Sequence, residues 1–277
     1  MNITIVGLGV IGGSFAKALK PFEEHEVYGI DSDVSTLSKA ESLGIIKKGY
    51  LEGKEPLEIS DLVILCIYPM SVLKFIESNK QYFKKGAIIT DATGVKGIMV
   101  DDILDSVGEN VDFVFGHPMA GREKKGIDFA SAEVFKGANY ILTPHHNNKA
   151  ENLKIVEDLV YSIGFSNVKK VNPYEHDKIV AYTSQLPHAM AVALVNSDDD
   201  KYPTGELIGD SYRDLTRIAN INEELWSELF LSNRENLIST IEVFQVKLED
   251  IKKSLVNNDK EKLIEIFKES SRRREKL

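Results

Sequence analysis

The sequence predicts an α/β fold with a doubly wound sheet, followed by an all-α domain. From residue 1 to about 171, short β-rich segments alternate with helical stretches, a pattern typical of parallel strands joined by crossover helices. After Asn172 and Pro173 the strand signals stop and helical patterns continue. We therefore expect two domains, residues 1–172 and 173–277, because 277 residues exceed what one core usually supports.

The expected strands are short and mostly apolar. The seven segments are residues 2–6, 26–30, 61–67, 87–91, 111–115, 139–142 and 167–171. Residues 62–67 are apolar throughout, which favours strands covered by helices on both faces. We expect Cys66, the single cysteine, to pack there as a small hydrophobic side chain.

In the second half, residues 226–255 have the spacing of one long amphipathic helix. Two neighbouring columns of apolar side chains repeat every seven residues: Leu237, Phe244 and Ile251, and beside them Ile241, Leu248 and Leu255. At 1.5 Å per residue this helix would extend roughly 45 Å, longer than a small domain needs. We therefore expect part of its apolar stripe to pack against a second subunit, which makes the protein a homodimer.

Composition narrows the class of protein. With 43% hydrophobic and 28% charged residues, and no apolar run that could span a bilayer, we expect a globular protein outside the membrane. The first residues enter a strand pattern without a secretory signal, so we expect a cytoplasmic location. The net charge of −9 argues against nucleic-acid binding, so an anionic substrate would need a local basic site.

A glycine-rich turn separates the first strand from a helical stretch. Its residues are Gly7, Leu8, Gly9, Val10, Ile11 and Gly12. The first glycine permits a tight turn, the second lets the backbone approach a pyrophosphate, and the third lets the helix pack against the strand. The helix N-terminus would point its amides at the phosphates. This context indicates a Rossmann-type dinucleotide site; the alternative is a turn whose glycines serve packing only.

Asp31 favours NAD over NADP. It ends the second expected strand, 19 residues after Gly12, where a carboxylate can accept hydrogen bonds from the adenosine ribose hydroxyls. The same carboxylate repels a 2′-phosphate. No lysine or arginine follows before Lys39 to attract one.

A second motif, Gly-His-Pro-Met-Ala-Gly at 116–121, follows the strand 111–115 at the carboxyl edge of the sheet, where such folds bind ligands. We expect this motif to be a loop. The imidazole of His117, with an ordinary pKa of about 6.5, can accept a proton near neutral pH. The alternative is a structural histidine.

Four stretches together make the chain resemble the prephenate and arogenate dehydrogenase family over nearly its whole length. They are the glycine turn with Asp31; Asp-Ala-Thr-Gly-Val-Lys-Gly at 91–97; Gly-His-Pro-Met-Ala-Gly-Arg-Glu at 116–123; and Leu-Pro-His at 186–188 with Tyr-Arg-Asp-Leu-Thr-Arg at 212–217. Their order matches the family architecture of a nucleotide domain followed by a helical dimerisation domain.

The resemblance implies an NAD-dependent oxidative decarboxylation of prephenate to 4-hydroxyphenylpyruvate, in tyrosine biosynthesis. His117 would accept the proton of the ring hydroxyl while hydride leaves the same carbon for the nicotinamide. Loss of carbon dioxide aromatises the ring, so the enzyme chiefly orients the substrate and assists proton loss, without a metal. The nearest alternative is arogenate dehydrogenase, which performs the same chemistry on an amino acid.

The resemblance also implies residues that bind the two substrate carboxylates. Arg217 matches the family's carboxylate-binding arginine, and a guanidinium suits this task because it forms paired hydrogen bonds. Arg213 lies one helical turn earlier on the same face. The alternative for both is a surface ion pair with Asp210 or Asp214.

Further residues have two open interpretations. Glu123 matches a family position near the substrate, or is a solvated carboxylate; His188 borders the active site by similarity, or is a core histidine. Lys96 could meet phosphate or substrate, or begin the next helix. His176 and Asp177 could form a proton relay, but we interpret them as the start of a helix.

The chain departs from the family pattern at two positions. Many members have a serine whose hydroxyl bridges the catalytic histidine and the substrate, where this chain has Gly94. Thr93 could supply that hydroxyl as a further catalytic group, or water could. Many members also have a histidine where this chain has Gln185, and the neutral amide could alter substrate preference or pH response.

Two other classes remain. A β-hydroxyacid dehydrogenase shares the two-domain plan but usually relies on a lysine in the helical domain, whereas this chain has His117. A noncatalytic NAD-sensing protein would use its long helix for association only.

Overall fold

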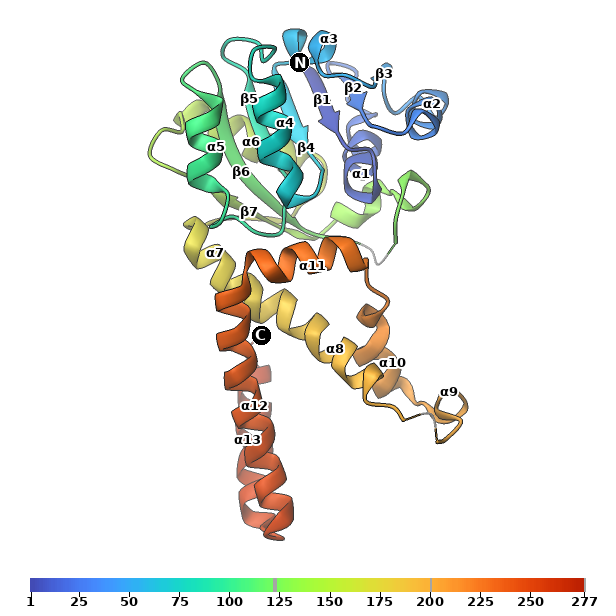
Figure 1. Cartoon of the computed structure of the whole chain (residues 1–277), viewed down its shortest axis with the longest axis vertical. Coiled ribbons are helices and arrows are strands. Elements are labelled where there is room, and N and C mark those ends of the chain that lie inside the picture. Colours follow the sequence, from blue (N-terminus) through green and yellow to red (C-terminus); the bar gives the residue numbers. More distant parts are fainter. Residues whose placement is uncertain (122–123, 200, 277) are drawn as a thin grey trace.

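A computed structural model describes residues 1–121, 124–199 and 201–276 of the chain. An eight-stranded sheet with helices on both faces forms the upper part of Figure 1, and a group of helices projects from it. The strands are β1 Asn2–Val6, β2 Glu26–Ile30, β3 Lys48–Tyr50, β4 Leu62–Leu65, β5 Ile88–Asp91, β6 Asp112–Met119, β7 Asn139–Thr143 and β8 Asn167–Lys170. The predicted fold class is thus confirmed.

The strand order is β3-β2-β1-β4-β5-β6-β7-β8. Strand order reverses between β1 and β4, and such a switch point opens a crevice at the carboxyl ends of the strands. Apolar side chains alternate between two buried faces: Leu62 and Ile64 belong to one core cluster, and Val63 and Leu65 to the other. The helices that cover these faces are α1 Val10–Leu19, α2 Val34–Ser42, α3 Lys54–Ile59, α4 Pro69–Asn79, α5 Val100–Val107 and α6 Ala150–Ser162.

The sheet differs from the prediction in three ways. β3 was not predicted, because three residues with one lysine and one glycine carry too little strand signal. β7 runs antiparallel to β6, whereas the other pairs are parallel. β6 continues to Met119, so the motif expected as a loop is largely strand, and His117 pairs with Ile141. Pairing with β5 ends at Val114, and beyond it the Gly116 amide and carbonyl bond to the side chains of Asp91 and Lys96 instead.

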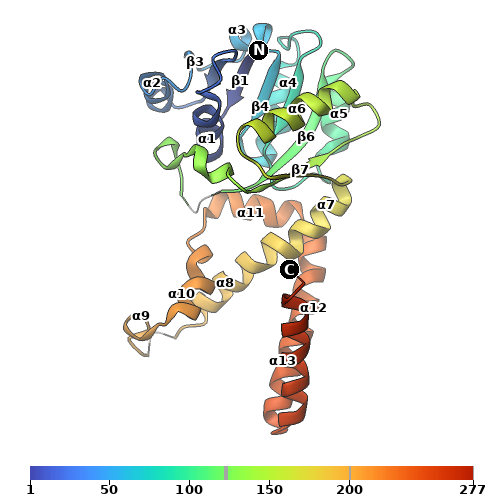
Figure 2. The ribbon, with the colours of Figure 1, turned by 180° about the vertical axis from the view of Figure 1, so that it is seen from behind.

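The helical part begins after β8. Its elements are α7 Pro173–Val180, a π-helical turn Ala181–Gln185, α8 Leu186–Asn196, α9 Thr204–Leu207, α10 Asp210–Thr216, a 3₁₀ turn Arg217–Ala219, α11 Glu223–Ser232, α12 Arg234–Val256 and α13 Lys260–Arg274. Helix α11 lies under the sheet, and α12 and α13 form a pair that extends away from it (Figures 1 and 2). Within the described ranges, no helix is long and apolar enough to cross a membrane.

The prediction of one helix over 226–255 is wrong, because Asn233 interrupts it. This residue has φ −118° and ψ 26° and joins α11 to α12. Its buried side-chain amide donates hydrogen bonds to the Asp177 carbonyl (2.8 Å) and to Oε1 of Gln185 (2.8 Å). Buried polar groups require such partners, so the break is stabilised by contacts that lie far away in the sequence.

Candidate active site

A cavity of about 600 Å³ lies at the carboxyl edge of the sheet, between the sheet and the helical part. Its walls come from the glycine turn, the segments after β4 and β5, the end of β6, the π-helical turn with α8, and α11. A second cavity of about 550 Å³ is lined by Gly7 and Asp31. Ile67 lines both cavities, and the glycine turn contributes Gly7 to one and Gly9 to the other.

The three glycines of the turn have different steric surroundings. Gly7 has φ +84°, a conformation that L side chains rarely adopt. A Cβ on Gly12 would lie 1.8 Å from the Gly7 carbonyl oxygen, so only glycine permits this packing of helix against strand. A Cβ on Gly9 would meet nothing within 4 Å, which leaves the backbone open to the cavity.

These residues fit a dinucleotide. Gly9 is the N-cap of α1 and provides no side-chain cap, so the first-turn amides can donate hydrogen bonds to phosphate oxygens. Asp31 is held in place because its carboxylate accepts the amides of Leu8 (2.7 Å) and Asp33 (2.9 Å). A ribose at Asp31 and a pyrophosphate at the turn would direct the other end of the molecule toward His117.

His117 lies at the inner end of the cavity. Its Nδ1 is 2.9 Å from Nε2 of His176, and a Cβ on Gly94 would lie 3.7 Å from its Nε2. Burial disfavours the charged imidazolium, and the charges of His176 and Lys96 add to this, so the pKa of His117 lies well below its ordinary value. The ring is therefore a neutral proton acceptor at neutral pH.

Beneath this histidine is a fully buried ion pair, Lys96 with Asp91, at 2.5 Å. The Lys96 ammonium also donates to the carbonyls of Thr93 (3.0 Å) and Gly116 (2.7 Å). Burial lowers the pKa of Lys96, and the Asp91 carboxylate opposes that shift. Lys96 thus takes neither role suggested by the sequence: it does not begin α5, and its partners are internal groups that hold the segments after β5 and in β6 together.

The Thr93 hydroxyl belongs to the same buried network. It donates to the Asp91 carboxylate and lies 2.9 Å from the Lys96 ammonium. Thr93 lines the cavity, but its side chain is only 4% exposed, and Gly94 is the neighbour that faces Nε2 of His117. To reach a substrate, the Thr93 hydroxyl would have to leave these partners.

On the helical wall, His188 is stacked on Trp226, with ring centroids 3.7 Å apart. Its Nδ1 donates to the Ser184 carbonyl at 2.9 Å. Both rings line the cavity. Sequence analysis missed Trp226, because a lone tryptophan in a helical pattern gives no signal of stacking on a histidine from another helix.

Gln185 has a structural role. Its side chain is 1% exposed, its Nε2 donates to the Leu229 carbonyl at 3.0 Å, and its Oε1 accepts from Asn233. It therefore fastens the π-helical turn to α11 and to the break before α12. The neutral amide at this position supports the helical wall by two hydrogen bonds that need no titratable ring.

The predicted substrate-binding residues Arg213 and Arg217 are both exposed, and neither lines the cavity. Arg213 forms an exposed ion pair with Asp210 (3.0 Å), the alternative that the sequence left open. Arg217 directly precedes Ile218, which lines the cavity. Glu123 lies outside the described residues. Lys124 lines the cavity as well, and it is a cation that sequence analysis did not single out.

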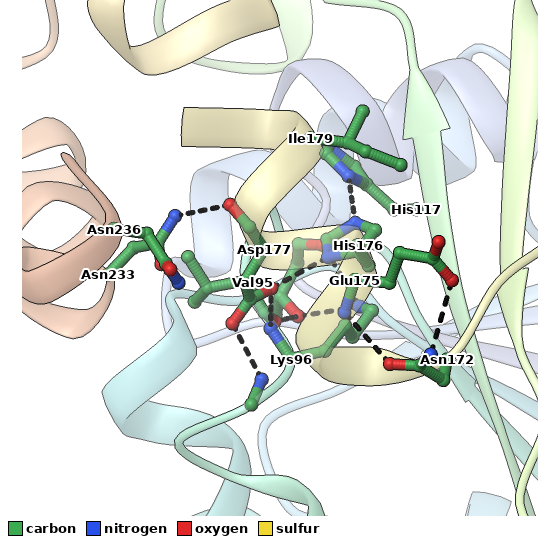
Figure 3. A network of polar contacts seen from close by, with 12 residues as sticks. Val95, Lys96, His117, Asn172, Glu175, His176, Asp177, Ile179, Asn233 and Asn236 are labelled. Atoms are coloured by element: carbon green, nitrogen blue, oxygen red, sulfur yellow. Dashed lines mark hydrogen bonds and ion pairs between the residues drawn. The ribbon is translucent and has the colours of Figure 1, made fainter. Parts of the chain in front are cut away.

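His176 and Asp177 are the most informative residues that the sequence left undecided. They lie within α7, as interpreted, and they also contact His117 and the segment after β5 (Figure 3). The adjacent His-Asp pair was a signal, but its partner His117 lies 59 residues earlier. Only the folded chain brings them together.

The fold and the site define a two-part dehydrogenase that uses a dinucleotide, with a neutral histidine where the sheet meets the helical part. The family model "Prephenate dehydrogenase, nucleotide-binding domain" matches residues 15–169, and "Prephenate dehydrogenase, dimerization domain" matches residues 172–269. The chain belongs to the prephenate dehydrogenase family.

Individual relatives support this assignment. Prephenate dehydrogenase of Lactococcus lactis subsp. cremoris is 32% identical over 100% of this chain and 77% of its own length. The structure of prephenate dehydrogenase from A. aeolicus with hydroxyphenyl propionate and NAD⁺ has a TM-score of 0.91 and 33% identity, covering 100% of this chain and 98% of that one. Synechocystis arogenate dehydrogenase has a TM-score of 0.84 and 26% identity, with coverages of 100% and 99%.

Proposed function

We propose that this protein uses NAD⁺ to oxidise prephenate to 4-hydroxyphenylpyruvate and carbon dioxide, a step of tyrosine biosynthesis. The observation that carries the proposal is the neutral His117, whose Nε2 side faces a cavity that begins at the glycine turn. The relatives from L. lactis and A. aeolicus carry the name of this activity, and the A. aeolicus structure contains NAD⁺ and hydroxyphenyl propionate.

In the proposed reaction, His117 does the proton chemistry. Its Nε2 accepts a hydrogen bond from the ring hydroxyl of prephenate and takes the proton as that C–O bond becomes a carbonyl. The bound nicotinamide supplies the hydride acceptor. The C–C bond to the ring carboxylate then breaks, and its electron pair aromatises the ring as carbon dioxide leaves. Proton acceptance by a positioned base commonly contributes about 10²- to 10⁴-fold to such a rate.

Prephenate carries two carboxylates, which the helical wall and its rim would hold. We assign them to Arg217, with Arg213 and His188 as further contacts, and Glu123 stays a prediction for substrate binding. A catalytic role for Thr93 also stays a prediction. Because its hydroxyl is engaged with Asp91, water at Gly94 is the simpler source of the hydrogen bond that a serine gives in other family members.

For the cofactor, we assign Gly7, Leu8, Gly9, Val10, Ile11 and Gly12 to the pyrophosphate and Asp31 to the ribose. The carboxylate of Asp31 disfavours a 2′-phosphate, and Lys39 is paired with Asp128. We propose that residues 1–172 hold NAD and that residues 173–277 close the site and dimerise. A cytoplasmic location stays a prediction.

The proposed homodimer rests on exposed apolar side chains of the projecting helices. Val243 is 60% exposed, Leu248 55%, Val256 76% and Phe267 57%. Exposed apolar side chains gathered on neighbouring helices are typical of association surfaces. Of the predicted columns on α12, Leu248 and Leu255 are exposed, Ile241, Phe244 and Ile251 are half-buried, and Leu237 is buried. We propose that the equivalent helices of a second copy cover the exposed side chains.

The deciding experiment measures NADH formation by the purified protein with prephenate and with arogenate, each with NAD⁺ and NADP⁺. We expect kcat/KM for prephenate well above that for arogenate, and NAD⁺ well preferred over NADP⁺. A preference for arogenate would overturn the substrate assignment while keeping the reaction type. No turnover with either substrate would overturn the proposed function.

A further inference from the structure

A chain of two hydrogen bonds leads from His117 away from the cavity, and it ends on a carboxylate of the helical part (Figure 3). Nδ1 of His117 lies 2.9 Å from Nε2 of His176, and Nδ1 of His176 lies 2.7 Å from Oδ1 of Asp177. His176 is 0% exposed and Asp177 3%. Bulk water therefore does not compete for these bonds.

Asp177 determines which ring nitrogens of His176 and His117 carry a hydrogen. Its Oδ1 accepts the Lys96 amide at 2.9 Å, and its Oδ2 accepts the Gly97 amide at 2.7 Å. A carboxylate can only accept hydrogen bonds. Nδ1 of His176 must therefore carry the hydrogen that lies toward Asp177.

The tautomer of His176 then determines the tautomer of His117, the proposed base. A neutral His176 that is protonated at Nδ1 has a lone pair at Nε2, so this nitrogen accepts and Nδ1 of His117 donates. The remaining lone pair of a neutral His117 is at Nε2. That nitrogen is beside Gly94 and the cavity, where the substrate hydroxyl would lie.

We propose that His176 and Asp177 are positioning residues, which hold the base His117 in the tautomer with a bare Nε2 and stabilise its imidazolium after proton transfer. This proposal rests on the proposed function for the identity of the substrate. Serine hydrolases use the same logic, in which a carboxylate fixes the tautomer of a histidine base, and loss of the correct tautomer there costs about 10⁴-fold.

The charges around His176 agree with a neutral pair of rings. The groups that face it are Asp177, His117, Lys96 and Asp91. Burial lowers the pKa of His176, and the hydrogen bond that its Nδ1 donates to Asp177 opposes this shift. Nδ1 of each ring already carries a hydrogen, and Nε2 of His176 accepts the one from His117. A further proton can therefore bind only at Nε2 of His117, and the reaction delivers that proton.

The same carboxylate also joins the two parts of the molecule. Asp177 belongs to α7, whereas Lys96 and Gly97 follow β5 in the sheet part. The Asp177 carbonyl accepts the amide of Asn233, at the start of α12. The orientation of the base therefore depends on correct docking of the helical part against the sheet.

The test compares His176→Phe with His176→Gln, and uses His146→Phe as the matched control, because His146 is an exposed histidine outside the site. We expect His176→Phe to lower kcat about 10²-fold or more, with KM and the Kd for NADH nearly unchanged. Glutamine can accept from His117 and donate to Asp177, so His176→Gln should recover part of the loss. His146→Phe should behave as the parent protein.

A spectroscopic measurement on the parent protein needs no substrate and no variant. In protein labelled with ¹⁵N-histidine, the shifts of His117 should identify Nδ1 as protonated and Nε2 as bare. The opposite tautomer, or an unchanged kcat in a folded His176→Phe protein, would overturn the positioning role. Since the tautomer is measured without turnover, failure of this proposal is distinguishable from failure of the substrate assignment.

Discussion

The two walls of the cavity are built on different physical principles. On the sheet wall, Asp91 and Lys96 are fully buried and His117 is held by a chain of hydrogen bonds. On the helical wall, the proposed carboxylate-binding segment lies in short helices, and the Arg213 side chain is 59% exposed. The proposed chemistry is thus placed on buried groups, and the proposed recognition of the substrate charges on exposed ones.

Each wall contains an ion pair, and the two pairs differ in how much free energy their loss would cost. An exposed pair such as Arg213 with Asp210 contributes about 0 to 1 kcal/mol, so exchanging Asp210 for a substrate carboxylate costs little. Removing one partner of a buried pair such as Lys96 with Asp91 leaves an uncompensated charge and costs about 3 to 5 kcal/mol. The Arg213 side chain can therefore exchange its partner at little cost, whereas Lys96 cannot.

The largest effect should come from the base on the sheet wall. His117→Asn removes the proton acceptor while keeping a similar polar volume, so kcat should fall about 10²- to 10⁴-fold. The Kd for NADH should stay close to that of the parent protein, because the glycine turn and Asp31 are untouched. His146→Asn is the control, and turnover within a few-fold of the parent after His117→Asn would remove the proposed base.

The pH dependence of the parent protein extends this prediction. A base must be deprotonated to act, so activity is lost as the pH falls through the pKa of His117. Because that pKa is lowered, kcat/KM should stay high below pH 6.5, where an ordinary histidine is half protonated. An acid limb in kcat/KM at or above that pH would contradict the buried, neutral state of His117.

A smaller effect, on KM rather than on kcat, should come from the helical wall. Hydrogen bonds to charged groups are worth about 1.5 to 3 kcal/mol, so Arg217→Ala should raise KM for prephenate about 10- to 100-fold. Arg217→Lys keeps the charge but not the paired hydrogen bonds, so its KM should lie between those of the parent protein and Arg217→Ala. Arg213→Ala should change KM only a few-fold. If KM is unchanged in Arg217→Ala, the carboxylate is held elsewhere, and Lys124 is the next residue to replace.

The smallest effect should come from the contact between the walls at Gly94. A Cβ there would lie 3.1 Å from Cδ2 of Leu229 on α11 and 3.7 Å from Nε2 of His117. Gly94→Ser adds a hydroxyl beside the base and should raise kcat about 2- to 10-fold, the worth of one hydrogen bond. Gly94→Ala adds the same carbon without the hydroxyl and should not raise kcat. Equal results for the two variants would mean that water already serves this position fully.

Features of the sheet wall could be predicted where local physics dominates. The positive φ of Gly7 and the steric demand on Gly12 arise within one turn, and the alternation of apolar strands with helices needs no knowledge of distant contacts. The end of β6 could not be predicted, because His117 extends the strand only when β7 pairs with it in the antiparallel direction. The helix break at Asn233 escaped prediction for a related reason, since its buried amide is satisfied by α7 and the π-helical turn.

The sequence by itself determined the α/β class followed by an all-α part, the nucleotide turn with Asp31, and the choice of His117 as the proposed base. These follow from residue spacing, backbone sterics and side-chain chemistry, which act over a few residues. Tertiary structure alone decided that Lys96 is an internal partner of Asp91, that Gln185 supports α11, and that His176 contacts His117. The contacts of Gln185 and His176 join residues that are far apart in the chain. Asp91 and Lys96 are close in sequence, but the energy of their ion pair depends on burial, which exists only once the sheet and the helices have packed.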